Sequence, residues 1–582
     1  MNLYSRKATY STVLFFLLFS SQIISAYQVP IGIPESPINF EQAPPPRAES
    51  WTANPVSETH GYYYINFTTG SDSRQYGTPL TPRRTIPFPI PAGSYIEIDG
   101  RYANAIGGVI KMNSMGTDDT WAAGSKGPVW ITSAPGKEGS FEKYKALAYG
   151  SNLFISNMIV QNNSSIQIGS MSEGYGVTNI VVRDSEFIGD PLTGNVALLS
   201  AVGHQNSSST NVILYNNVIR DLGDIYNPND VDATCIGVSG YTSYVWILNN
   251  KGFNASGPGL QINAMPPRTA SHNIYAGDNE FYNVRQSGMW VKYASNVVFS
   301  SNYVHNIIST PWSPAKAMGA QYEPNGLWMI NNKIHDTEYG IRIPSTNAIE
   351  DTDIKVYMIG NVIYNIHTES PVGTSSAWES AGIHIQGAQE RYIYNNLIFN
   401  TPNGINISST SGMTDIKNNI ILKVDANHTT GQGYQIWSEH HQRAPELLVS
   451  NNFFGTDEMS VQLNKTNFAT TLSLDAHLNA GTTSEVSTNF SGPVDVAQID
   501  LEQIALEGYD NSRLWDFGKD MYPELSTTLS ELLNKNVPID SDFLRKERVL
   551  GSSVDIGPFE QQGTNSNIII PEKPGNVQII LQ

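Results

Sequence analysis

The chain has 582 residues, of which 40% are hydrophobic and only 15% are charged. Asp and Glu outnumber Lys and Arg by 53 to 34, which gives a net charge of −19, and the sequence contains no basic run. This balance argues against nucleic acid as a partner, because a protein that binds nucleic acid needs a basic patch or stripe. The abundance of Gly (48) and Tyr (29) favours a β-rich body with many tight turns over a helical one.

Residues 1–26 are predicted to be a secretory signal peptide. Arg6 and Lys7 form a charged region, the apolar run VLFFLLFSSQII covers 13–24, and two small residues precede the expected cleavage point. The run is too short to span a bilayer, and no later segment is long enough to do so. We therefore expect a secreted protein, extracellular or periplasmic, without a membrane span. Cys235 is the only cysteine, so a large core must supply the stability that disulfides give other secreted proteins.

Residues 27–100 are expected to form an N-terminal lead-in and cap. The segment begins Pro-rich and polar, and two later stretches, GYYYINFTTGSDS from Gly61 and GSYIEIDGRY from Gly93, are typical of strands. A cap of this kind covers the first strands of a repeat array, whose open edge would otherwise favour aggregation.

One short pattern recurs eleven times between residues 101 and 470. It consists of alternating apolar residues, a small polar pair that is often Asn-Asn, and one to three largely apolar residues. A repeat this short cannot enclose its own core, so it must stack on its neighbours as a solenoid. The second residue of the pair falls, at intervals of 23 to 35 residues, at Asn157, Ser185, Asn217, Asn250, Asn279, Asn302, Asn332, Asn361, Asn396, Asn419 and Asn452.

A second strand, often opened by Gly, follows the pair in many repeats. The alternation has a period of two, which indicates strands with one face inward and one outward, and a period of 3.6 is absent. Helix–turn–helix repeats are therefore excluded. The Gly-led strands are GLQIN (259–263), GMWVK (288–292), GIRIP (340–344), GIHIQ (382–386) and GINIS (404–408).

Over roughly residues 100–470 these features resemble the right-handed parallel β-helix superfamily of polysaccharide lyases, glycoside hydrolases and carbohydrate epimerases. The segment VDIGPFE, which begins at Val554, is similar to a closing motif of secreted members. The resemblance implies an all-β fold, a right-handed parallel β-helix of about eleven or more coils with an N-terminal cap and a small C-terminal cap. We expect the β-helix at 101–470, the C-terminal cap at 471–561 with helices near 501–508 and 526–535, and a tail at 562–582.

Overlaying the Gly-led strands predicts two columns of outward side chains. The first is Gln261, Trp290, Gly319, Arg342, His384, Asn406 and Gln435, and the second is Ser239, Asn263, Lys292, Gln321, Pro344, Gln386, Ser408 and Trp437. Aromatic rings stack on sugars, amides bond hydroxyls, and cations pair with carboxylate or sulfate. We therefore expect this face to bind a polysaccharide of the anionic class through Gln261, Asn263, Trp290, Gln321, Gln386 and Trp437.

Lys292, Arg342 and His384 are the candidate catalytic residues for β-elimination. Cleavage of a uronic-acid polymer in this way needs a base for the C5 proton and a cation for the carboxylate. The resemblance to β-helix lyases of the alginate and dermatan type implies a Lys base and a nearby Arg, and His384 can take either role. Coils stack about 4.8 Å apart, so Lys292 and Arg342, two coils apart, are separated by roughly 10 Å. Arg342 and His384 are two coils apart if residues 354–381 contribute a coil, and fewer otherwise.

Acidic residues define the alternatives. Asp230 or Asp232 together with Glu323 would provide the paired carboxylates of a glycoside hydrolase. Asp221 and Asp224, in the same long turn as Asp230 and Asp232, either bind Ca²⁺ or cap turns.

The sequence thus predicts a secreted, monomeric, polysaccharide-degrading enzyme, with β-elimination preferred over hydrolysis. A C5-epimerase and a non-catalytic glycan-binding adhesin are further alternatives. The adhesin is disfavoured by the long irregular turns at 220–235, 309–325 and 367–381, from which a simple stalk gains nothing.

Overall fold

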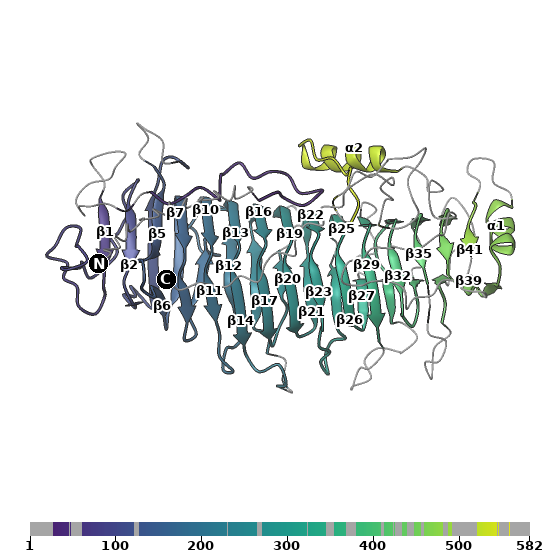
Figure 1. Cartoon of the computed structure of the whole chain (residues 1–582), viewed down its shortest axis with the longest axis horizontal. Helices are drawn as coiled ribbons and strands as arrows, with labels where there is room; N and C mark the ends of the chain where they lie inside the picture. The colour runs from purple at the N-terminus through teal and green to yellow at the C-terminus, as the bar shows by residue number, and fades with distance from the viewer. Residues whose placement is uncertain are drawn as a thin grey trace, which may run out of the picture.

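The computed structural model forms one elongated body whose strands run across its long axis (Figure 1). Helix α1 (Thr471–Asn479) lies at one end of this body, and α2 (Tyr522–Leu533) lies along its side. The structure describes residues 27–45, 47, 61–120, 127–227, 229, 231–264, 270–322, 324–344, 354–367, 380–408, 412–422, 424, 433–438, 447–455, 459–480, 487–491, 521–543, 545 and 558.

Three parallel ladders of strands run the length of the body, and a full coil contributes one strand to each. The first ladder consists of β1 (Tyr62–Ile65), β2 (Tyr95–Ile98), β5 (Val129–Ser133), β7 (Lys145–Ser156), β10 (Val177–Arg183), β13 (Ser209–Tyr215), β16 (Thr242–Leu248), β19 (Ser271–Gly277), β22 (Ala294–Ser300), β25 (Asn325–Ile330), β28 (Lys355–Ile359), β31 (Glu390–Tyr394), β34 (Met413–Lys417) and β37 (Leu447–Ser450).

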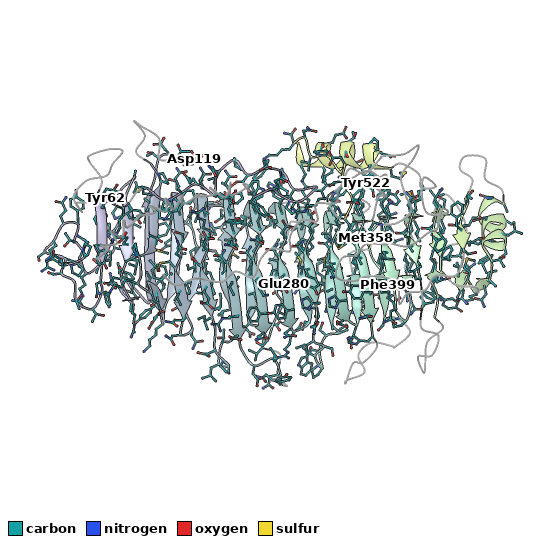
Figure 2. All side chains as sticks on the ribbon, in the orientation of Figure 1. Tyr62, Asp119, Glu280, Met358, Phe399 and Tyr522 are labelled. Carbon is teal, nitrogen blue, oxygen red and sulfur yellow. The ribbon has the colours of Figure 1, made fainter. Side chains whose placement is uncertain are left out.

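The second ladder is made of shorter strands. It consists of β3 (Arg101–Tyr102), β6 (Ser140–Glu142), β8 (Ile159–Gln161), β11 (Glu186–Ile188), β14 (Val218–Leu222), β17 (Lys251–Ala255), β20 (Glu280–Val284), β23 (Tyr303–His305), β26 (Lys333–Thr337), β29 (Val362–Ile366), β32 (Leu397–Phe399), β35 (Ile420–Ile421), β38 (Phe453–Phe454) and β41 (Phe490–Ser491). Figure 2 marks Glu280 and Phe399 of this ladder.

The third ladder completes each coil. It consists of β4 (Val109–Met115), the first residues of β7, β9 (Ser165–Ile168), β12 (Ala197–Gly203), β15 (Thr234–Gly240), β18 (Leu260–Asn263), β21 (Ser287–Lys292), β24 (Lys316–Gln321), β27 (Tyr339–Ile343), β30 (Ala381–Ile385), β33 (Ile405–Ile407), β36 (Ile436–Ser438) and β39 (Val461–Leu463). It ends where β40 (Thr466–Phe468) pairs antiparallel to β39.

This architecture is the predicted all-β, right-handed parallel β-helix. The second ladder alone has 14 strands, so the stack exceeds the eleven repeats seen in the sequence. Stacking begins inside the predicted lead-in, since β1 pairs in parallel with β2 and β2 with β5. Inward apolar residues of all three ladders form one continuous core, as in Val212, Ile219 and Ile236.

The recurrent polar pair forms a ladder of its own inside the body, here called the asparagine ladder. In each pair from Asn216-Asn217 onward, the second residue is a buried Asn whose Nδ2 donates to Oδ1 of the next Asn at 2.9–3.1 Å. From Asn216 to Asn451 the residue before it is left-handed, as Asn216 and Asn249 are (φ 53° for both), which Asn and Gly tolerate best. The ladder runs through Asn217, Asn250, Asn279, Asn302, Asn332, Asn361, Asn396, Asn419, Asn452 and Asn489.

The first copy of the pattern differs by one residue from the predicted alignment. Asn157 has a left-handed backbone (φ 52°) and follows Ser156, which pairs with Arg183. It therefore aligns with Asp184, and Met158 occupies the position of Ser185. The reason is that Ser156 and Asn157 look like a polar pair although only the second belongs to the turn.

The outer face of the first ladder is covered by two segments distant in sequence. Ile33, Ile38 and Phe40 of the N-terminal segment pack there, as do Leu529 and other apolar residues of α2. Tyr27 helps to hold the N-terminal segment, because its N–H donates to Glu41 Oε2 (2.7 Å). Figure 2 shows Tyr522 of α2 above the strand that carries Met358.

The predicted C-terminal cap is thus divided between two places. Helix α1 lies at the end of the β-helix, and α2, which covers the expected helix at 526–535, lies on its side. The signal peptide (1–26), the expected helix at 501–508 and the tail (562–582) lie outside the described residues. No helix in the described part of the chain has the length and apolar character needed to cross a membrane.

Candidate functional site

The outer face of the third ladder carries the two predicted columns. In the first column Gln261, Trp290, Gly319, Arg342, His384 and Asn406 are successive partners in register. In the second column Ser239, Asn263, Lys292 and Gln321 follow one another in the same way. The predicted alignment is therefore confirmed for the first column through Asn406 and for the second column through Gln321.

Beyond that coil the predicted columns are wrong by two residues. Asn406 pairs with Trp437, and Trp437 with Gln462, so Trp437 belongs to the first column. Gln435 is buried, donating to Ile421 O at 3.1 Å and accepting from Ser460 N at 3.0 Å. The error arises because the Gly that opens the other strands is separated from Ile436 by Tyr434 and Gln435.

The coil spacing resolves the ambiguity about Arg342 and His384. Strands β27 and β30 pair directly, with Arg342 opposite His384, because residues 354–366 form β28 and β29 of the same coil as β27. Lys292 and Arg342 are two coils apart, as predicted, because β24 lies between β21 and β27.

Lys316, the first residue of β24, is a cation that the sequence reasoning missed. It pairs in register with Ser287 and Tyr339, and its Nζ lies 5.0 Å from the centre of the Trp290 ring, on the outer face of the ladder. Its Nζ also donates to Ser313 Oγ in the turn before the strand. The residue is only 7% exposed. These contacts hold the Lys316 side chain in one position, so it does not move freely in solvent.

The environment of Lys316 favours its neutral form. Burial is the main cause that lowers the pKa of its ammonium to about 7, and the positive charges of Arg342 and Lys292 lower it further. The carboxylates of Glu338 and Asp232 act in the opposite direction but do not outweigh burial. A neutral amine near pH 7 is a competent base.

Arg342 and His384 flank the Tyr339 ring. The Arg342 guanidinium carbon lies 4.5 Å from the ring centre, and the His384 ring stacks on the same ring at 5.4 Å. Burial, followed by the charge of Arg342, lowers the pKa of His384 to about 3, so the imidazole is neutral above that pH. Its Nε2 is 3.0 Å from Ser408 Oγ.

Two buried nitrogens of this group have no hydrogen-bond partner among the described residues. They are Arg342 Nε and His384 Nδ1, on residues directly paired between neighbouring coils. Buried polar atoms are satisfied in nearly all native structures. An arginine N–H can only donate, so a partner for Arg342 Nε must be an acceptor, and neither nitrogen is open to solvent in this structure.

The carboxylates near Lys316 are held by the protein. Asp232 Oδ1 accepts from Gln286 Nε2 at 2.6 Å, and the buried Glu338 accepts the backbone N–H of Ala315 through Oε2 at 2.9 Å. Asp232 was a predicted site residue, whereas Glu338 was not. The predicted Asp230 and Glu323 lie outside the described residues.

The predicted calcium ligands are engaged otherwise. Asp221 bonds the Arg220 guanidinium and accepts from Asn254 Nδ2 at 2.9 Å, and Asp224 Oδ1 caps the turn at Tyr226 N at 2.9 Å. In the described part of the chain, no three His, Cys, Asp or Glu side chains gather as metal ligands. These two carboxylates do not fit a shared calcium site.

The remaining predicted sugar contacts lie on both sides of this centre. Asn263 is exposed, while Gln261, Gln321 and Gln386 are half-buried. Trp290 is almost fully buried (4% exposed) beneath Lys316. At the far end Trp437 Nε1 donates to Gln462 Oε1 at 2.9 Å, which orients the indole on the outer face.

Lys316 and Tyr339 could have been found from the sequence. The predicted columns already align Gly319 with Trp290 and Gln321 with Lys292, which is the register that the structure has. The same overlay, continued three residues before the first column, places Lys316 and Tyr339 opposite Ser287.

Comparison with known proteins finds only distant likenesses, all of them among solved structures. No protein-family model matches the sequence, and no curated protein matches it. Among solved structures, the GH136 lacto-N-biosidase from Eubacterium ramulus is 12% identical, with a TM-score of 0.35 over 68% of this chain and 67% of that one. The PL6 family alginate lyase AlyGC is 12% identical, with a TM-score of 0.38 over 64% of this chain and 50% of that one.

The periplasmic alginate epimerase AlgG is a third similar structure, 13% identical with a TM-score of 0.28 over 56% of this chain and 74% of that one. At these identities and TM-scores the likeness assigns neither a family nor an activity to this chain. Chemistry must be argued from this chain's own residues.

Proposed function

We propose that this protein is a secreted enzyme that cleaves a uronic-acid polysaccharide by β-elimination. Lys316 acts as the base and Arg342 binds the carboxylate of the reacting sugar. The observation that carries the proposal is the buried Lys316 amine one coil from Arg342, whose Nε has no partner among the described residues. A base and a carboxylate-binding cation side by side are what this reaction needs.

The proposed reaction begins at C5 of the uronate. The neutral Lys316 Nζ takes the C5 proton, and the electrons of that C–H bond form the C4–C5 double bond as the C4–O4 bond breaks. The leaving O4 oxygen takes up a proton, which the protonated Lys316 can supply. Arg342 stabilises the negative charge that builds on the carboxylate, and His384 Nδ1 lies beside it as a second nitrogen.

Lys316 replaces Lys292 as the proposed base for two reasons. Lys316 belongs to β24, which pairs directly with the strand of Arg342, whereas Lys292 lies one coil farther away. The pKa of Lys316 is lowered to about 7 by burial, so a large fraction is neutral at physiological pH. The rate should therefore rise with pH up to about 7 and level off above it.

The test is an assay of the mature protein on uronic-acid, sulfated and neutral polysaccharides, with and without a calcium chelator. Ultraviolet absorbance of the unsaturated product and new reducing ends are followed together. A parallel rise of both supports β-elimination. Reducing ends without absorbance would contradict it and indicate hydrolysis, with Asp230, Asp232 and Glu323 as the next candidates. Inversion at C5 without cleavage would indicate an epimerase, and binding without turnover an adhesin.

Two variants test the assigned roles. Lys316→Met should lower kcat about 10³-fold, the usual scale for loss of a general base. Arg342→Gln should lower kcat/KM about 10²-fold through loss of charge stabilisation. Lys251→Met, on the second ladder, is the matched control and should retain wild-type activity. Equal activity of the Lys316→Met variant and the control would reject Lys316 as the base.

A further inference from the structure

Lys292 differs from a comparable lysine elsewhere on the surface. Lys251 of the second ladder lies 5.1 Å from the centre of the Tyr282 ring, and its Nζ pairs with Glu280 Oε2 at 2.9 Å. Lys292 of the third ladder lies 6.0 Å from the centre of the Tyr322 ring, but no carboxylate among the described residues pairs with it. The two sites share a lysine over a tyrosine, and among the described residues only the first lysine has a carboxylate partner.

The surroundings of Lys292 suit a sugar ring. Tyr322 is 38% exposed and stacks on Tyr293 with ring centres 5.2 Å apart at 14°. Both tyrosines have left-handed backbones (φ 59° and 54°), which fixes them at the turn that follows the third ladder. Asn263 and Gln321 are the neighbours of Lys292 in register. An aromatic face, two amides and one cation together match an acidic sugar.

Lys292 lies one coil from Lys316, whose pKa its charge lowers, but it is farther from Arg342, the residue proposed to bind the reacting carboxylate. Arg342 lies two coils away, roughly 10 Å along the axis, and two residues away along the strand direction. One pyranose ring cannot bridge that distance. A polysaccharide lying along the third ladder would therefore present a different sugar residue to Lys292 than to Arg342.

We propose that Lys292, Tyr322 and Tyr293 form a second anionic subsite, which binds the carboxylate of a uronic-acid residue remote from the one that reacts. This proposal rests on the proposed function, which supplies the direction of the polysaccharide along the third ladder and the class of its sugars. It makes the protein selective for uronate oligomers long enough to reach both cations. Sugars on the other side, towards Trp437, meet neutral groups among the described residues, namely His384, Asn406 and Ser408.

The experiment measures binding in the absence of turnover, in full-length mature protein carrying Lys316→Met. Titration calorimetry compares dimers and hexamers of galacturonate and of mannuronate, each with its carboxyl-reduced counterpart. Adding Lys292→Gln should weaken hexamer binding about tenfold, as expected for loss of one charge-assisted hydrogen bond. It should leave dimers and carboxyl-reduced hexamers unchanged. Adding Lys251→Gln instead is the control and should change nothing.

The outcomes separate this proposal from the proposed function. If the wild-type protein produces unsaturated uronate but Lys292→Gln leaves hexamer affinity unchanged, the second subsite is wrong and the lyase assignment stands. If hexamers bind and Lys292→Gln weakens them while no polysaccharide is cleaved, the subsite stands without the lyase. Equal weakening of dimers and hexamers would also overturn the proposal, because a single nearby contact would then explain the effect.

Discussion

The outer faces of the first and third ladders are built on the same coils but differ in what covers them and in the chemistry of their side chains. On the first ladder the outward side chains are mostly large and apolar, and the N-terminal segment and α2 cover them. On the third ladder the outward side chains include Trp290, Lys292, Lys316, Arg342 and His384, three of them lysine or arginine on a chain of net charge −19.

The polar atoms of the two faces show what the difference means. On the covered face Trp130 Nε1 donates to Ser156 Oγ at 3.1 Å and Trp246 Nε1 to Pro34 O at 2.8 Å, whereas Trp328 Nε1 has no hydrogen-bond partner among the described residues. On the third ladder Arg342 Nε and His384 Nδ1 have none among the described residues, and both side chains lie against the Tyr339 ring. An outward tryptophan therefore does not by itself identify a binding face.

Trp328 provides the largest expected effect on the covered face. It is fully buried and stacks on Tyr357 with ring centres 3.7 Å apart. Trp328→Ala should lower the free energy of unfolding by about 4 kcal/mol, measured by denaturant titration, because it leaves a large cavity under α2. Activity per folded molecule should not change. A loss of kcat/KM in the folded variant would show that the two faces are coupled.

On the third ladder, the substitution Lys316→Met should raise the free energy of unfolding, whereas Trp328→Ala lowers it. The Lys316 pKa is about 7 in the folded chain and near its ordinary 10.5 in the unfolded chain, so the unfolded chain binds more protons between these values. The wild type therefore gains stability as pH rises from 7 to 10.5. The variant should be more stable by on the order of 3 kcal/mol at pH 6.

The difference between wild type and Lys316→Met should shrink towards pH 10.5. Thermal or denaturant unfolding at several pH values measures it. Lys251→Met, which removes a paired surface lysine, should show no such gain at pH 6. Parallel stability curves for wild type and Lys316→Met would mean that the lysine is solvated in the folded chain.

A smaller effect on the free energy of unfolding is expected for the substitution His384→Asn at acidic pH. The pKa of His384 is about 3 in the folded chain against an ordinary 6.5, so the unfolded chain binds more protons between those values, and stability falls as pH decreases from 6.5 to 3. His384→Asn removes this titration. Between pH 6.5 and 4 the free energy of unfolding should fall by about 2 kcal/mol less in the variant than in the wild type. The midpoints of denaturant titrations at several pH values measure this difference. An unchanged acid profile would place the imidazole in water.

The smallest effect is expected at the second ladder. Lys251 and Glu280 are partly exposed, so Lys251→Gln should lower the free energy of unfolding by about 0.5 kcal/mol at low salt, and by less at high salt. Binding and activity should stay at wild-type values. A larger loss would mean that this pair contributes to stacking between β17 and β20, and Lys251 would then be a poor control for Lys292.

The sequence predicted the fold well because period and spacing determine it. The repeated Asn and the alternation gave the stacking order, and the Gly-led strands brought Arg342 opposite His384. Lys316 was missed because it lies three residues before the first column, outside the two positions that the overlay compared. The place of α2 could not be predicted, because an amphipathic helix such as Tyr522–Leu533 shows that it has a partner but not which ladder covers it.

The uneven repeat has a consequence for how such a protein can change. The intervals between successive residues of the asparagine ladder vary from 23 to 37 residues, yet the hydrogen bonds between their amides stay within 2.9–3.1 Å. Residues inserted between two ladder positions therefore lengthen a turn without displacing any strand. Turns can be replaced one at a time while the asparagine ladder stays intact, so a lineage could acquire new substrates without losing the fold.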